Sequence, residues 1–238
     1  MIFTAAYRAL QYLFTPQYRI LIMKALGLTF IILAILWLFL RHLFLSYFAL
    51  WLLHFFPELS NWRGWLELSI LIIFNLGLAW LMAFWIAPIT AMIGGFFIDD
   101  AAEIIEKEAY PNEPLGHALS FGRSLILSLK FVVLSLLGNG IAFILFFVPG
   151  VNLIAFYMIN GYLFGREYFL FAAYRFRSEQ EARAFLRIHY ATVFGAGLLI
   201  ALFVSIPFLN LTTPLFAAAL MTHLHKMLSQ KTAINITP

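Results

Sequence analysis

Two long uncharged stretches, each interrupted by a proline motif, most strongly restrict what this chain can fold into. Residues 131–165 and 190–222 lack Asp, Glu, Lys and Arg over 35 and 33 consecutive positions. Within them, residues 148–153 and 206–211 both read apolar-Pro-x-aliphatic-Asn-Leu. Because proline lacks a backbone donor and breaks helices, each stretch is predicted to turn back on itself as a helical hairpin.

The length of these stretches predicts how deeply the hairpins enter a membrane. One continuous helix would be about 50 Å long at about 1.5 Å per residue, whereas a single crossing needs about 20 residues. Pro149 and Pro207 divide the stretches into arms of 18 and 16 residues and of 17 and 15 residues. Such arms are short and their turns carry no charge, which predicts hairpins that enter the bilayer without fully spanning it. Six ordinary spans with tight, buried turns are the alternative.

Composition places the chain in a membrane. Apolar residues make up 63% of the sequence and charged residues only 11%, against roughly one quarter charged in soluble domains. The predicted fold class is therefore an all-α integral membrane protein, with residues 1–238 forming a single membrane domain. The chain contains no cysteine, which excludes disulfides and thiolate metal sites.

Helical spacing and breaks divide the chain into helices and hairpins. The N-terminal helix carries Phe3, Tyr7 and Phe14 on one face and Arg8 on another, so it is predicted to be amphipathic and to lie at the membrane interface. Beyond Pro88, the second long helix is predicted to kink and to emerge into water. The predicted elements are an interfacial helix at 1–14, long transmembrane helices at 16–56 and 64–108, and hairpins at 120–175 and 185–228. Basic residues gather on one side of this multi-pass arrangement, which predicts that both termini are cytoplasmic.

The start of the first long helix has the chemistry of an anion site. The first N–H groups of a helix have no internal partner and lie at the positive end of its dipole, and Pro16 is typical of a first helical position. An arginine can hold an oxyanion through two parallel hydrogen bonds. The predicted anion-binding residues are Gln17, Tyr18, Arg19 and Lys24. The alternative is that the two cations only anchor the helix among lipid phosphates.

Two further polar sets lie within or beside apolar sequence. Uncharged donors at the hairpin tips are interpreted either as the lining of an anion path or as caps for backbone groups. The hairpin-tip set is Pro149, Gly150, Asn152, Asn210, Thr212 and Thr213. Sequence neighbours do not face each other on a helix, so Arg166 and Glu167 are each expected to find another partner. The predicted polar network, either structural or a pore gate, is Glu103, Glu106, Arg166, Glu167 and Arg175.

Other chemistry is not indicated. No catalytic residue, metal site, cofactor or nucleic-acid partner is predicted, and His223 and His225 lack a third ligand. The acidic residues at 99–106 are interpreted as a solvated helix face rather than a cation site. Gly161 and Gly165 have the small-x-x-x-small spacing of closely packed membrane helices, which suits an oligomer or a hairpin contact.

Four segments, taken in order, carry a resemblance to a known family. They are Ala87-Pro88 before an acidic helix, Phe147-Val148-Pro149-Gly150, Gly161-Tyr162-x-x-Gly165-Arg166-Glu167-Tyr168, and Ile206-Pro207-Phe208-Leu209-Asn210. In this combination the chain resembles the CysZ sulfate permeases and the wider etoposide-induced-protein-2.4 domain family. The resemblance covers essentially the whole chain.

The resemblance implies a bacterial inner-membrane protein with two long spanning helices, two intramembrane hairpins and an oligomeric assembly. It implies uptake of sulfate for cysteine synthesis, with sulfate or a related oxyanion, membrane lipid and further copies of the chain as partners. The family's sulfate motif, Pro-Gly-(Ile/Leu)-Arg-Arg, reads Pro16-Gln17-Tyr18-Arg19-Ile20 here. Its proline and first arginine match, whereas its glycine and second arginine do not. The alternative function is a membrane scaffold or lipid-interacting protein that does not transport.

Overall fold

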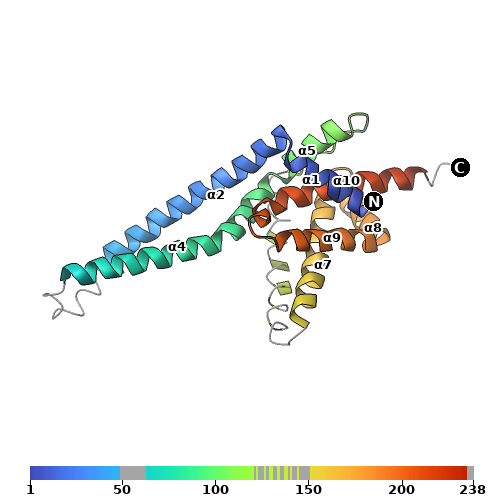
Figure 1. Ribbon diagram of the computed structural model, residues 1–238. Helices are drawn as coiled ribbons and strands as arrows, with labels where there is room; N and C mark the ends of the chain where they lie inside the picture. Colours follow the sequence, from blue (N-terminus) through green and yellow to red (C-terminus); the bar gives the residue numbers. More distant parts are fainter. Residues whose placement is uncertain are drawn as a thin grey trace. The chain divides into compact units, whose positions relative to one another are not determined.

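The computed structural model describes residues 1–48, 63–120 and 151–234, together with scattered residues between 121 and 150. Every regular element in these parts is a helix and none is a strand, which confirms the all-α prediction for the described residues (Figure 1). The elements are α1 (Ile2–Leu13), α2 (Pro16–Leu43), the π-helical η1 (Phe44–Phe48), α4 (Arg63–Phe96), α5 (Ile98–Ala109), α7 (Val151–Tyr174), α8 (Glu179–Ile188), α9 (Tyr190–Val204), the 3₁₀ helix η3 (Leu209–Thr212) and α10 (Thr213–Ile234).

The chain divides into two compact units. Lys24–Ile93 forms the smaller unit, and Met1–Met23 with Gly94–Pro238 forms the larger one. Within the smaller unit, η1 meets α4 where the rings of Phe44 and Phe74 stack with their centroids 3.6 Å apart.

The helix that begins at α2 has the length and composition of a membrane span. Pro16–Tyr47 is continuous over 32 residues, and only 22% of its most apolar window is buried within the protein. Ile31, Ile35 and Leu38 are among its exposed apolar side chains. A helix of this length that leaves its apolar surface uncovered is suited to lipid rather than to a soluble core.

The long helix predicted at 64–108 consists of two helices. The backbone remains helical through Pro88, and α4 ends at Phe96. At the break, the Phe97 N–H donates to the Gly94 carbonyl (3.0 Å). Gly94 lies so close to Pro214 that an added Cβ would be 2.7 Å from that ring. The kink expected beyond Pro88 is therefore a break at Phe97, since a helix can tolerate one proline but ends more readily at a glycine pair.

Helix α10 forms the centre of the larger unit. It packs against α1, α5, α7 and α9, and every side chain from 213 to 226 is buried. α1 contributes Ala5, Ala9 and Leu13 to this core and leaves Phe3 and Tyr7 exposed. The amphipathic character predicted for the N-terminal helix thus separates a packed face of small side chains from an exposed aromatic face.

Helices α7 and α9 cross with almost no space between their backbones. A Cβ added at Gly197 would be 2.0 Å from the Gly161 carbonyl oxygen and 2.7 Å from the Gly165 Cα. A Cβ at Gly165 would be 2.7 Å from the Val193 carbonyl oxygen. The spacing of Gly161 and Gly165 therefore serves a contact within the chain, between arms of the two predicted hairpins.

The turn between α9 and α10 contains a strained backbone conformation. Phe208 has φ 65° and ψ −41°, and the Leu209 N–H donates to the Pro207 carbonyl (2.8 Å). This is a γ-turn of the rare positive-φ form, and a bulky residue there costs about 1–2 kcal/mol. The Phe208 side chain is nonetheless 86% exposed, so packing against the described part of the chain does not account for it.

Candidate functional site

The predicted anion site begins where α1 passes into α2. Helix α2 starts at Pro16, as the sequence predicts, but the Thr15 hydroxyl donates back to the Tyr12 carbonyl of α1 (2.8 Å). The Arg19 N–H donates to the Thr15 carbonyl (2.9 Å). An anion at this helix start would therefore meet the Arg19 side chain rather than its amide.

The four predicted anion-binding residues are divided between the surface and the core. Tyr18 is fully buried, and its hydroxyl donates to the Leu215 carbonyl of α10 (3.0 Å). Tyr18 thus ties the first turn of α2 to the core of the larger unit. Gln17, Arg19 and Lys24 are exposed, and Lys24 lies further along α2, beyond the boundary between the two units. The role of these three in anion binding stays a prediction.

Arg175 is the centre of a buried group of charges. It follows α7, and only 3% of its side chain is exposed. Its Nε and Nη2 donate to the two carboxylate oxygens of Glu106 (2.8 and 3.1 Å), and its Nη1 donates to Asp99 Oδ1 (2.5 Å). The Gly116 N–H also donates to Glu106 (2.8 Å). Burial by itself would lower the pKa of Arg175, but the two carboxylates raise it above its ordinary value.

Other members of the predicted network form local pairs instead. Glu103 pairs with Lys107 on the exposed side of α5 (2.6 Å), and the hydrogen bond from Lys107 lowers the pKa of Glu103. Arg166 pairs with its neighbour Glu167. The expectation that these neighbours need other partners was wrong, because a long arginine side chain can bend back to an adjacent carboxylate. Residues 99–106 are likewise not a uniformly solvated face, since part of this segment binds the buried arginine.

Polar residues of the second hairpin tip bind the backbone. The Asn210 N–H donates to the Ile206 carbonyl (3.1 Å), and the Thr212 hydroxyl donates to the Leu209 carbonyl (2.9 Å). The Thr213 hydroxyl is buried and has no hydrogen-bond partner in the described part of the chain. The side-chain contact of Thr212 fits the capping interpretation, whereas the Asn210 contact joins two backbone groups.

The first hairpin is described mainly by its second arm. Helix α7 begins at Val151, directly after the predicted tip, and Asn152 lies in its first turn. Pro149, Gly150 and the Asn152 side chain lie outside the described residues. Their place in an anion path therefore stays a prediction.

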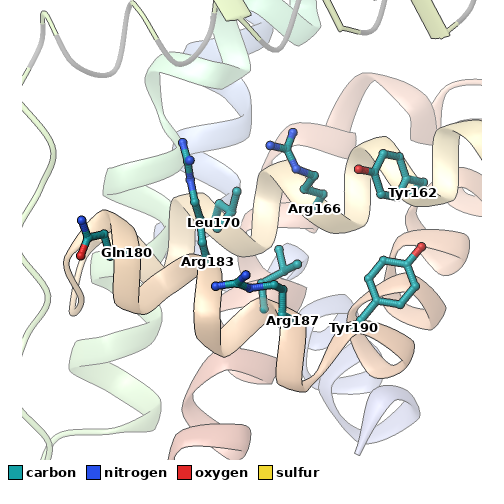
Figure 2. Close-up of a pocket in the computed structure, with 8 residues that line it drawn as sticks. Tyr162, Arg166, Leu170, Gln180, Arg183, Arg187 and Tyr190 are labelled. Carbon is teal, nitrogen blue, oxygen red and sulfur yellow. The ribbon is translucent and has the colours of Figure 1, made fainter.

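A pocket lies between α7, α8 and the start of α9 (Figure 2). Its volume is about 640 Å³, which is within the range of roughly 300–1,000 Å³ found for small-molecule sites. The lining residues are Tyr162, Arg166, Leu170, Gln180, Arg183, Leu186, Arg187 and Tyr190. Three of the eight are arginines and none is acidic.

Local structure explains how the pocket is assembled. Tyr162, Arg166 and Leu170 are spaced four apart on α7, as are Arg183 and Arg187 on α8, so each set lies along one helix face. A capping box starts α8, in which the Ser178 side chain accepts from the Glu181 N–H. The chain then bends by 88° between α8 and α9.

Sequence reasoning identified one member of this pocket, Arg166, and assigned it to the polar network. It missed Arg183 and Arg187 as site residues. The available signal was their four-residue spacing in a short polar segment that directly precedes apolar sequence. That signal cannot reveal that this segment faces α7.

The described residues form an all-helical protein with one long helix whose apolar surface is exposed, as in a membrane protein. No group of metal-ligating side chains occurs among the residues that the structure describes. A family model described as Sulfate transporter CysZ/Etoposide-induced protein 2.4 matches residues 5–214, and the chain belongs to this family. The match confirms the family indicated by the sequence motifs. Comparison with curated proteins gives no match.

Proposed function

We propose that the protein mediates sulfate uptake across the bacterial inner membrane, where the sulfate supplies cysteine synthesis. The observation that carries this proposal is the family match over residues 5–214, since the family description names a sulfate transporter. The exposed guanidinium of Arg19 in the first turn of α2 supports it. This position combines a fixed positive charge with the positive end of a helix dipole.

Transport of labelled sulfate into proteoliposomes tests the function directly. We expect faster entry than into protein-free vesicles, and Arg19→Ala is expected to weaken sulfate binding about tenfold or more, since a hydrogen bond to a charged group contributes about 1.5–3 kcal/mol. Arg41→Ala is the matched control, because Arg41 is also exposed but lies near the other end of α2. Flux equal to that of protein-free vesicles would refute sulfate transport and favour a scaffold or lipid-interacting role. Unchanged binding in Arg19→Ala would leave Arg19 as a lipid anchor.

The proposed architecture has two long spanning helices, two hairpins that stop within the bilayer, and both termini in the cytoplasm. The exposed apolar surface of α2 supports the first long span. The apolar second tip supports a buried position, because Ile206, Phe208 and Leu209 are all exposed on the chain itself. Several copies of the chain are proposed to assemble in the membrane, with lipid covering their remaining apolar surface.

Cysteine labelling tests the depth of the second hairpin without interference, since the chain has no native cysteine. Leu209→Cys is expected to resist an impermeant thiol reagent applied from either side, because the tip lies in the hydrocarbon region. Lys107→Cys is the matched control at an exposed position of α5 and should react only from the cytoplasmic side. Free reaction of Leu209→Cys from outside would mean that the hairpin is an ordinary pair of spans.

A further inference from the structure

The pocket between α7 and α8 presents donors from two helices to the same space. Arg166 projects from α7, and Arg183 and Arg187 project from α8. Figure 2 shows the guanidinium groups of Arg166 and Arg183 extending to the same side of the pocket. A guanidinium has five N–H donors and no acceptor, so these side chains suit a ligand that has several oxygen acceptors and a negative charge.

Two of these charges are partly compensated by carboxylates that do not line the pocket. Glu167 pairs with Arg166, and Glu179 pairs with Arg183. In the described part of the chain, no carboxylate is paired with Arg187. The pocket therefore keeps an excess of positive charge, and Arg187 is its main source.

The carboxylates paired with Arg166 and Arg183 also affect how readily a bound anion is released. The Arg183–Glu179 pair is about half exposed, at 48% and 47% of the two side chains, so water screens it and it is weak. The Arg166–Glu167 pair is more enclosed, since only 8% of the Glu167 side chain is exposed. Nearby carboxylates reduce the net attraction for an anion, which keeps binding weak enough for the anion to leave, as conduction requires.

Uncharged groups complete the lining. The rings of Tyr162 and Tyr190 lie with their centroids 6.5 Å apart, and each side chain is about half exposed. Their hydroxyl groups can donate to an oxyanion without adding charge. The pocket lies beside the 88° bend that joins polar α8 to apolar α9, so a bound anion would be held where the polar and apolar parts of the chain meet.

We propose that Arg166, Arg183, Arg187 and Tyr162 form a second oxyanion-binding site, which takes a tetrahedral anionic group such as sulfate. The proposal rests on the proposed function, because the bound anion is taken to be the transported one. The phosphate of an anionic lipid headgroup has the same chemistry, and the experiment separates these two sources.

The test measures binding of labelled sulfate to the full-length protein in nanodiscs of pure phosphatidylcholine. Arg187→Gln is expected to lower the sulfate affinity about tenfold or more, since it removes a charged donor, and Arg183→Gln combined with Arg187→Gln should lower it further. Lys107→Gln is the matched control, because it removes an equal charge from an exposed site outside the pocket, and its affinity should stay within about twofold of wild type.

A parallel arm identifies the source of the oxyanion. Nanodiscs with phosphatidylglycerol should leave sulfate binding at the pocket unchanged if free sulfate is the ligand. If phosphatidylglycerol lowers sulfate binding to the wild type but not to Arg187→Gln, the lipid headgroup competes with sulfate at this pocket. That result would support the site but assign it to lipid. If the double variant binds both sulfate and phosphatidylglycerol like wild type, the site is refuted.

The outcomes for this site and for transport are distinguishable. If Arg19→Ala reduces the sulfate flux while Arg187→Gln changes neither the flux nor sulfate binding, the pocket is refuted and sulfate transport is retained. If the wild type shows no sulfate flux but binds sulfate, and Arg187→Gln loses that binding, transport is refuted and the site is retained. Gel filtration of each variant verifies its fold. Arg183 and Arg187 are exposed, so their substitution should leave the fold intact.

Discussion

Replacement of Gly197 by alanine is expected to destabilise the protein by about 3 kcal/mol or more, at the upper end of overpacking effects. The added Cβ would lie 2.0 Å from the Gly161 carbonyl oxygen and 2.7 Å from the Gly165 Cα and N. These are backbone atoms, so no side chain can rotate to make room. Helices α7 and α9 would have to separate along their crossing, and contacts on both sides of it would be lost. Thermal unfolding in detergent should show an apparent Tm lower by about 5 °C or more.

The neighbouring glycine provides the control for this experiment. A Cβ at Gly195 would meet the Ile2 Cδ1 at 3.0 Å, which is the flexible end of a side chain. Gly195→Ala should therefore change the free energy of unfolding by no more than about 1 kcal/mol, the difference in helix propensity between the two residues. Similar apparent Tm values for the Gly195 and Gly197 variants would contradict the close α7–α9 crossing.

Removal of Arg175 is expected to cost about 3–5 kcal/mol, because it leaves buried carboxylates without their counter-ion. Glu106 is 1% exposed and receives two hydrogen bonds from the guanidinium. Asp99 receives a third. Chemical denaturation or thermal unfolding of Arg175→Ala measures this loss.

Two comparisons separate a charge effect from a packing effect. Lys107→Ala breaks the exposed pair with Glu103 and should cost about 1 kcal/mol or less. The double variant Arg175→Met, Glu106→Leu removes both main charges of the buried pair and should recover much of the stability lost by Arg175→Ala. If the double variant is less stable than Arg175→Ala, the uncompensated carboxylate is not the cause of the loss.

Much of the fold can be predicted because it depends on local composition. An apolar stretch without charges has to satisfy its backbone groups internally in a membrane, which leaves the helix as the main solution. Pro16 marks the start of α2 for a local reason, its fixed φ and missing donor. Pro88 shows where local reasoning fails, since α4 continues through it and ends only where Gly94 packs against Pro214.

The candidate sites also combine features set by local sequence with features set by contacts between distant segments. The exposed position of Arg19 is set by the helix that begins at Pro16. Tyr18, by contrast, is buried in the core, where its hydroxyl donates to the carbonyl of Leu215, 197 residues away in the sequence. Arg183 and Arg187 become a pocket only because the turn at Ser178 and the bend after α8 bring them against α7.

The sequence by itself determined that this chain is helical, belongs in a membrane and carries the motifs of its family, because these properties depend on composition and short spacing. Only the tertiary structure decided that Gly197 meets Gly161 and Gly165, that Arg175 is neutralised by α5, and that three arginines share one pocket. Each of these depends on segments that are distant in the sequence. Their contacts are selected by packing and charge balance over the whole unit, which no local pattern contains.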